Sequence, residues 1–303
     1  MKLKQFKAIL RPLLFFAGIV FIILLIRHIW SDLYTQLSKI QWNGFFLSII
    51  VASLGNLSTS ILFRELLHKY GVDVSSTSVH KIFFFAQIAK YIPGKIWTLW
   101  YQSILLSKPG AIYALIFANI DMTMLQIGMV TAISGALIFL NINFIFSAIT
   151  ILIGLLFCFF IVKSNHLYMI IEKILLYFSY KINAFEKTAF IKSYLLFVYY
   201  IFFGATYLVS NSMMLTSAFQ FSVSESLVYT AYLSLAWVIS ALSFIVPGGM
   251  GIRELVFIAL IQSFSASASF EVLAMIAVVS RFWVILQEIL GVFFAFFWSR
   301  FFN

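Results

Sequence analysis

The sequence predicts an all-α polytopic membrane protein with about six transmembrane helices and two re-entrant hairpins, each broken at Pro-Gly. Its 303 residues are 63% hydrophobic and only 10% charged, and their mean hydropathy is +1.05. Globular proteins are close to half apolar and a quarter charged, so this composition excludes a soluble enzyme, a nucleic-acid binder and a disordered chain. The apolar stretches run for about 20 residues or more, which is typical of membrane helices rather than barrel strands.

Six stretches are long enough to cross a hydrocarbon core at 1.5 Å per residue. The first follows a basic N-terminal start and lacks a small-residue cleavage site, so we expect it to remain as an uncleaved span. The six predicted spans are residues 10–30, 44–63, 111–139, 143–163, 190–217 and 270–299.

Two further apolar stretches, 79–106 and 226–264, are interrupted at their centres. The first contains Ile-Pro-Gly-Lys, and the second contains Val-Pro-Gly-Gly-Met-Gly. Proline removes a backbone donor and glycine permits a sharp reversal, so each stretch is predicted to enter the membrane and return to its own side. Alternatively, the first arm of the second stretch crosses the membrane by itself.

The distribution of basic residues supports this layout. With the N-terminus inside, 14 of the 20 Lys and Arg lie inside, only Lys39 lies outside, and five lie at membrane depth. Such a bias is typical of cytoplasmic loops and predicts that both termini are cytoplasmic. The net charge of +10 is therefore expected to face anionic membrane lipids and not nucleic acid. The composition, rich in Phe, Ile and Lys, suggests an AT-rich bacterial genome, and the expected location is the bacterial inner membrane.

The same layout predicts an inverted repeat of two halves, 1–140 and 141–303. Each half reads span, span, hairpin, span, and the two tips are 154 residues apart at Pro93 and Pro247. Three crossings per half give the halves opposite orientations, and paired broken segments are the best sequence sign of a transporter's binding site. Between the halves, 164–188 is predicted to form an amphipathic helix on the cytoplasmic leaflet.

No catalytic or metal-binding pattern is recognisable. The four histidines are scattered, Cys158 is the single cysteine, and there is no phosphate-binding glycine loop. We therefore expect no enzyme activity, no metal and no cofactor.

Ionisable residues at membrane depth are the notable feature, because each costs about 2.5–3.5 kcal/mol at the centre of a bilayer. Lys90 and Lys95 flank the first tip, Arg253 and Glu254 follow the second, and Arg281 lies in the middle of the last span. Positive charges outnumber negative ones in this set, and an excess of positive charge favours binding of a phosphate group.

Two acidic residues are candidates for proton coupling. Asp121 lies about 15 Å into its span, and Glu288 shares a helix face with Arg281, about 10 Å away. The alternative is structural pairing: Asp121 with Arg281, and Arg253 and Glu254 with the opposite hairpin.

The stretches KYIPGKIWTLW (90–100) and FIVPGGMGIREL (244–255) resemble the two signatures of the lysylphosphatidylglycerol synthase transmembrane family, also called the flippase-like domain family. The resemblance covers essentially the whole chain and implies movement of a lipid with a large polar head group. The family's aminoacyl-transferase domain is missing, and Tyr101 and Gln102 stand where many relatives carry an arginine. Together, charge and resemblance imply substrate contacts at Lys90, Pro93, Gly94, Lys95, Trp97, Pro247, Gly248, Gly249, Gly251, Arg253, Glu254 and Arg281.

The expected function is therefore a flippase-like transporter of an anionic lipid carrier, first of all a polyprenyl-phosphate-linked sugar for cell-surface polysaccharide. Glycosyltransferases of such a pathway are the implied protein partners, and an oligomer is compatible with the sequence. The alternatives are a flippase of an anionic or aminoacylated phospholipid, a membrane-embedded glycosyl transferase using Asp73 or Glu65 as base, and a scaffold of an assembly complex.

Overall fold

The computed structural model describes residues 20, 22–91, 96–106, 111–139, 144–162, 193–242, 249, 251–264 and 268–301. Within these ranges the regular elements are all helices, joined by short non-helical segments, and there is no strand. The labelled helices are α2 (Trp30–Lys39), α3 (Trp42–Lys69), α4 (Ser76–Ala89), α5 (Ile96–Leu106), α6 (Ala111–Phe139), α7 (Phe144–Val162), α9 (Ser193–Phe219), α10 (Val223–Leu242), α11 (Ile252–Phe264) and α12 (Phe270–Phe301).

Four of the described helices are long and apolar enough to cross a membrane: α3, α6 over Ala111–Ile138, α10 and α12. Helix α12, with 32 residues, is about 48 Å long and exceeds a ~30 Å hydrocarbon core. The apolar part of α7, Ile145–Leu156, is shorter. The architecture is therefore that of an all-helical chain compatible with a membrane protein.

The predicted helical stretches and the observed helices agree closely, with two differences. Helix α3 runs to Lys69, six residues beyond its predicted end, and α2 was not predicted. Helix α2 is amphipathic and buries Leu33, so its polar remainder reads as a loop in the sequence. The predicted amphipathic helix at 164–188 and most of the first span lie outside the described residues, as do five site residues: Pro93, Gly94, Lys95, Pro247 and Gly248.

Both broken stretches form two helices that pack against each other. Helix α4 ends at Ala89 before the first tip, and α5 begins at Ile96 after it. Helices α10 and α11 flank the second tip in the same way. Because α4 and α5 have 14 and 11 residues, about 21 and 16 Å, neither is long enough to cross a membrane alone. Helix α10, with 20 residues, is long enough.

Local side-chain and backbone chemistry determines where α10 and α11 begin. Helix α10 starts with a capping box in which the backbone N–H of Ser222 donates to Glu225 Oε2 at 2.9 Å and the N–H of Glu225 donates to Ser222 Oγ at 3.2 Å. Before α11, Gly249 and Gly251 have φ values of +63° and +79°. Glycine adopts this left-handed region without steric cost, so the residues after the tip can reverse the chain.

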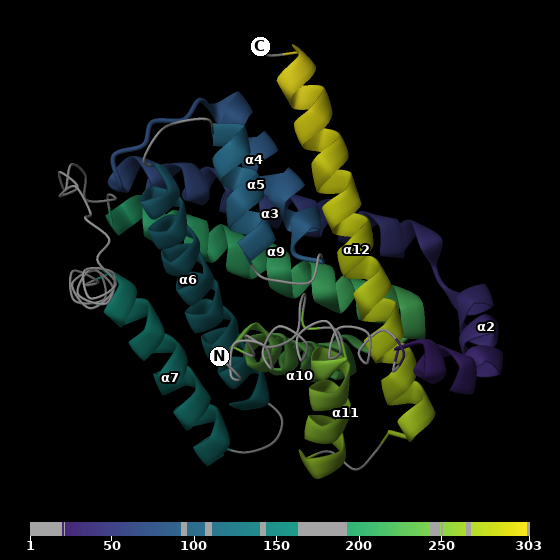
Figure 1. Cartoon of the computed structure of the whole chain (residues 1–303). Coiled ribbons are helices and arrows are strands. Elements are labelled where there is room, and N and C mark those ends of the chain that lie inside the picture. Colours follow the sequence, from purple (N-terminus) through teal and green to yellow (C-terminus); the bar gives the residue numbers. More distant parts are fainter. Residues whose placement is uncertain are drawn as a thin grey trace, which may run out of the picture.

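Two large hydrophobic clusters, with two smaller ones around α6 and α10, form the core of the described part of the chain. One joins α2, the starts of α3 and α12, the end of α9, α10 and α11, and the other joins the end of α3, α4, α6 and the C-terminal part of α12. Helices α3 and α12 contribute to both clusters. Figure 1 shows α3 and α9 crossing the middle of the molecule, and these two helices pack closely because Gly55 faces Thr206, whose Oγ1 would lie 2.6 Å from an added Cβ. Helix α4 packs on α12, and α10 packs on α6.

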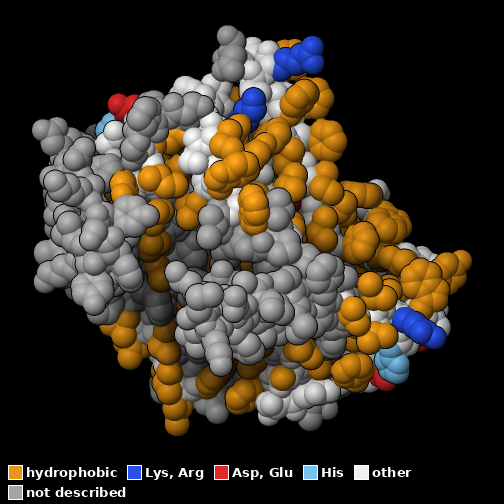
Figure 2. Space-filling view, viewed as in Figure 1, with side chains coloured by type: hydrophobic (Ala, Val, Ile, Leu, Met, Phe, Trp, Pro, Cys, Tyr) orange, Lys and Arg blue, Asp and Glu red, His pale blue; other side chains and the backbone are white. Residues whose placement is uncertain are grey.

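The surface carries many large apolar side chains, which a water-soluble fold would bury. On α12, Phe282 and Phe293 are 62% and 57% exposed, and on α7, Ile145 is 70% exposed. In Figure 2, apolar side chains make up much of the part of the visible face that is not grey, and the few coloured charged side chains lie mostly toward its edges. This distribution is what a hydrocarbon environment around the middle of the molecule requires.

Two segments far apart in sequence meet at one end of the molecule. Gln36 Nε2 donates to the carbonyl of Ala218 at 2.5 Å, and Gln220 Nε2 donates to the carbonyl of Lys39 at 2.7 Å. The loops at 40–41 and 220–222 therefore lie side by side. The sequence layout assigns both loops to the same side of the membrane.

Candidate functional site

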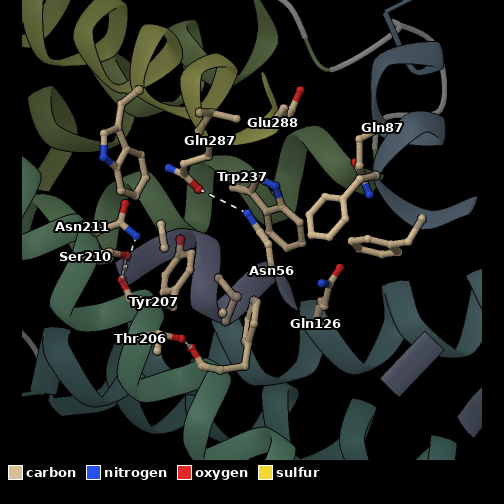
Figure 3. Close-up of a pocket in the computed structure, with 18 of the residues that line it drawn as sticks. Asn56, Gln87, Gln126, Thr206, Tyr207, Ser210, Asn211, Trp237, Gln287 and Glu288 are labelled. Atoms are coloured by element: carbon tan, nitrogen blue, oxygen red, sulfur yellow. Dashed lines mark hydrogen bonds between the residues drawn. The ribbon is translucent and has the colours of Figure 1, made fainter. Parts of the chain in front are cut away.

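A cavity of about 180 Å³ lies between helices that come from both parts of the chain. Its wall contains side chains of α3, α4, α6, α9, α10, α11 and α12 (Figure 3). The volume is several times the ~30 Å³ that one molecule occupies in liquid water, so a small polar group fits inside.

Uncharged hydrogen-bonding side chains outnumber charged ones in the lining, and apolar side chains fill the rest of the wall. Five amide side chains contribute, and Asn56 Nδ2 donates to Gln287 Oε1 at a long 3.5 Å. Gln287 is 7% exposed, and its Nε2 has no hydrogen-bond partner among the described residues. Such a buried donor is costly unless a ligand or water accepts its hydrogen bond. The amides are Asn56, Gln87, Gln126, Asn211 and Gln287.

Aromatic and hydroxyl groups complete the wall. Trp237 lies beside the amides in Figure 3. Tyr207 shares a 2.8 Å hydrogen bond with Ser234, and Trp283 Nε1 donates to Ser48 Oγ at 2.8 Å, so both ring systems are held in place. Apolar ring faces with convergent polar groups are the usual composition of a small-molecule site.

An ion pair joins two distant parts of the chain at this cavity. Lys90 follows the last residue of α4, and its Nζ pairs with Glu288 Oε1 on α12. The second carboxylate oxygen of Glu288 is buried and has no hydrogen-bond partner among the described residues. Both residues line the cavity, so a ligand entering it meets this pair.

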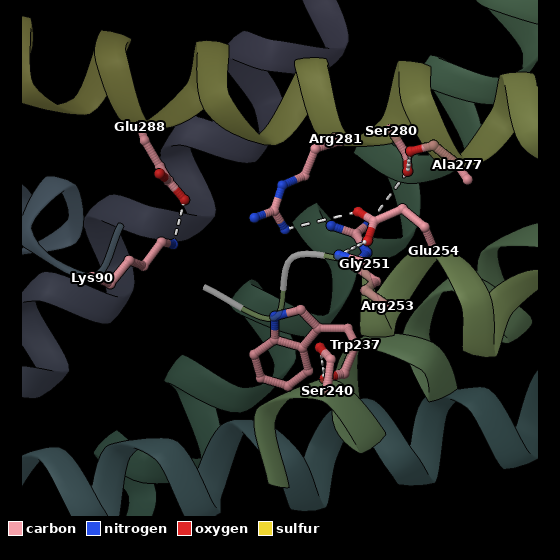
Figure 4. Close-up of polar contacts among 10 residues, drawn as sticks. All are labelled: Lys90, Trp237, Ser240, Gly251, Arg253, Glu254, Ala277, Ser280, Arg281 and Glu288. Carbon is pink, nitrogen blue, oxygen red and sulfur yellow. Dashed lines mark hydrogen bonds and ion pairs between the residues drawn. The ribbon is translucent and has the colours of Figure 1, made fainter. Parts of the chain in front are cut away.

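Arg253, in the first turn of α11, brings a second positive charge into the same cavity. It is 6% exposed, and its Nη2 reaches Ser280 Oγ at 3.5 Å (Figure 4). Its Nε has no hydrogen-bond partner, and no described carboxylate oxygen lies within 4.0 Å of the guanidinium. Of the predicted substrate residues that the structure describes, Arg253 and Lys90 are the two that line the cavity.

Glu254 and Arg281 lie next to this cavity and not in its wall. The backbone N–H of Gly251 donates to Glu254 Oε2 at 2.8 Å, which caps the start of α11. Arg281 Nη1 lies 4.0 Å from Glu254 Oε1. Both side chains line a second cavity of about 290 Å³, whose other lining residues are Ile22, Ile26, Tyr91, Val278, Phe282 and Ile285.

Asp121 is held elsewhere. Its Oδ2 accepts hydrogen bonds from Lys69 Nζ at 2.7 Å and from the Tyr70 hydroxyl at 2.6 Å, and the side chain is 3% exposed. The expected alternative of an Asp121–Arg281 pair is therefore wrong, because each residue has a nearer partner of opposite charge. Asp121 lines neither cavity described above.

The other predicted residues that the structure describes are also away from the polar cavity. Trp97 is 40% exposed on α5 and stacks edge-on against Trp100. Gly249 and Gly251 shape the backbone before α11. Asp73, a candidate base of the transferase alternative, lies 3.2 Å from His68, and its side chain is 82% exposed.

The sequence reasoning missed the amides because it searched only for charge. An uncharged amide inside an apolar span is nevertheless a usable signal, since it also needs a partner in hydrocarbon. Asn56 and Asn211 lie 155 positions apart, almost the separation of the two Pro-Gly tips, and both line the cavity.

Within the described ranges, no group of three or more His, Cys, Asp or Glu is placed to hold a metal ion. No family model, no curated protein and no solved structure matches the chain.

Proposed function

We propose that this protein is a flippase-like transporter that moves an anionic lipid carrier, first of all a polyprenyl-phosphate-linked sugar for cell-surface polysaccharide, across a bacterial inner membrane. The observation that carries the proposal is a buried polar cavity inside a helical, apolar-surfaced protein. A polar head group crossing hydrocarbon needs such a cavity, because its hydrogen bonds must be replaced along the way. The proposal also includes the relation to the flippase-like family that the two tip sequences resemble.

The charges of the cavity support an anionic cargo. Lys90, Arg253 and Glu288 line it, and the Lys90–Glu288 pair leaves Arg253 without a carboxylate partner among the described residues. An arginine fork can hold two phosphate oxygens, and Lys90 supplies a mobile point charge. An aminoacylated phospholipid would add a cation beside these two residues, which disfavours that alternative.

The amides and indoles favour a sugar over a simple phospholipid. A sugar offers hydroxyl groups that donate and accept, and Asn and Gln side chains do both as well. Gln287 Nε2 is a buried donor without a partner, and Trp237 and Trp283 offer apolar ring faces beside the amides. A site of this kind discriminates strongly against a cargo that lacks the hydroxyl groups.

The packing of the helices supports two related halves. Helix α4 from the first half packs on α12 of the second, and α10 from the second half packs on α6 of the first. In an inverted repeat these are equivalent contacts, and each cavity wall would then combine a broken segment with the last span of the other half.

Flipping by purified protein in sealed vesicles tests the proposal. The probe is a fluorescent prenyl-phosphate sugar, and the readout is the fraction that an external quencher can no longer reach. We expect the wild-type protein to flip the probe. In Arg253→Gln the flipping rate should fall about 10- to 100-fold, because a hydrogen bond to a charged group contributes about 1.5–3 kcal/mol. Arg253→Lys should also be impaired, since the charge remains but the fork is lost.

Two outcomes would contradict the transporter. If the sugar leaves its phosphate during the assay, the protein is a transferase. If wild type and Arg253→Gln bind the probe equally and neither flips it, the scaffold alternative is favoured.

A further inference from the structure

The second cavity has the opposite chemistry to the first. It has a volume of about 290 Å³, and apart from Tyr91, Glu254 and Arg281 its lining is made of aliphatic and phenyl side chains. It lies between residues 22–26 and α12, and the 62% exposed Phe282 is part of its rim. The cavity is therefore open toward the apolar surface of the molecule.

The two cavities share one wall. Lys90 lines the polar cavity, and the next residue, Tyr91, lines the apolar one. Arg253 and Glu254 divide in the same way at the start of α11. On α12, Val284 faces the polar cavity and Ile285 the apolar one. At each of these three places, two consecutive residues of the chain line the two different cavities.

Basic side chains lie along this wall. Arg253 projects into the polar cavity, and Arg281 lines the apolar cavity and lies between the Lys90–Glu288 pair and Glu254 in Figure 4. The order across the wall is thus hydrogen-bonding groups, then charged groups in which Arg253 and Arg281 stand beside the Glu254 carboxylate, then hydrocarbon. A carrier lipid has the same order along its length: sugar, phosphate, and chain.

We propose that the apolar cavity binds the first part of the hydrocarbon chain of the same anionic amphiphile whose head group enters the polar cavity, with its phosphate at Arg253 and Arg281. This inference rests on the proposed function and adds a chain-binding site to it. The occupant is a phosphate-linked hydrocarbon chain and not bulk lipid, because Arg253 and Arg281 lie where the apolar cavity borders the polar one.

Photolabelling of the full-length protein tests this site. The probe is a prenyl monophosphate that carries a diazirine in its chain, used as a minor component of phosphatidylcholine vesicles, and labelled residues are mapped by mass spectrometry. We expect labels on 22–26 and 278–285 that excess unlabelled prenyl monophosphate displaces and prenyl alcohol does not. Labels confined to outward residues such as Phe293 and Phe297, or displaced equally by the alcohol, would overturn the proposal.

A pair of variants on α12 sharpens the test. Ile285→Trp fills the apolar cavity and should lower displaceable labelling by about tenfold, whereas Ile289→Trp, one turn further on and 43% exposed, should not. Equal labelling in the two variants would contradict the chain site.

Failure of this site and failure of transport give different results. If displaceable labelling is found but the protein does not flip the probe, the chain site is supported and the transporter is contradicted. If wild type and Ile285→Trp flip the probe equally and no displaceable label is found, the chain site is contradicted and the transporter is still supported.

Discussion

The ammonium group of Lys90 and the carboxylate of Glu288 form an ion pair between residues 198 positions apart. Seven residues earlier on α12, Arg281 leaves the helix on the same side and reaches Glu254 at the start of α11 (Figure 4). One helix therefore contacts both broken segments through charged side chains. Movement of either segment must break or exchange one of these pairs.

Breaking the first pair should destabilise the protein. In Glu288→Gln the Lys90 charge loses its partner, and we expect a loss of about 1–2 kcal/mol, below the usual range for a fully buried pair because the Lys90 side chain is 34% exposed. Thermal unfolding in detergent measures this loss. The double variant Lys90→Glu/Glu288→Lys should recover most of the stability. Lys81, which is exposed on α4, serves as the control, and Lys81→Gln should have no effect. Absence of recovery would show that the two charges do not interact in the folded protein.

Asp121 should prove structural. Asp121→Asn removes the charge that Lys69 and Tyr70 contact, so we expect destabilisation by about 1–3 kcal/mol. Transport per folded molecule, and its response to an imposed proton gradient, should stay as in wild type. The same gradient assay on Glu288→Gln should show a loss of response. The opposite pattern would make Asp121 the coupling residue.

The cavity amides should select the sugar and not the phosphate. Asn56→Leu and Gln287→Leu should each weaken binding of a prenyl-phosphate sugar about tenfold and leave binding of prenyl monophosphate nearly unchanged. Binding is measured by competition in vesicles. Asn119→Leu is the control: its amide bonds Gln102 at 2.8 Å outside the cavity and should cost stability without changing selectivity. Equal weakening for both ligands would contradict sugar recognition.

The residue after the second tip should require a left-handed backbone. Gly251 has φ +79°, and a Cβ there costs roughly 1–2 kcal/mol, so Gly251→Val should unfold at a lower temperature than wild type. Gly251→Asn should be milder, because asparagine tolerates this conformation. Gly249→Ala adds a clash, since its Cβ would lie 3.0 Å from Ser240. If Val and Asn behave alike at 251, backbone conformation does not govern this turn.

Cysteine labelling should separate the two ends of the molecule. In a Cys158→Ala background, cysteines at Ser38 and Ser224 should react with a membrane-impermeant reagent from one side, and those at Ser76 and Arg300 from the other. We expect the first side to be periplasmic, because the basic loops favour the cytoplasm. Reaction of Ser38 and Ser76 from the same side would require a different number of crossings.

Composition and the length of the apolar stretches were sufficient to predict the described helices other than α2. Helix α6 occupies 111–139 as predicted, and one helix ends before each Pro-Gly pair and another begins after it, because hydrophobic length and backbone chemistry are local properties. Lys90 and Arg253, the two basic residues of the described ranges that line the cavity, were also identified, since an ionisable group in an apolar stretch needs a polar environment.

Tertiary structure decided which groups meet. The sequence offered Arg281 as a partner for Asp121, but the packing of α3 beside α6 brings Lys69 Nζ to 2.7 Å from the Asp121 carboxylate. An ion pair depends on the distance between the charges in the folded chain, which the spacing of residues in the sequence does not give. Likewise, Asn56 and Gln287 are 231 positions apart and read as isolated polar residues until α3 and α12 bring them to one cavity. Long-range contacts depend on how helix faces pack, and that information lies in side-chain shape rather than in the pattern of any one segment.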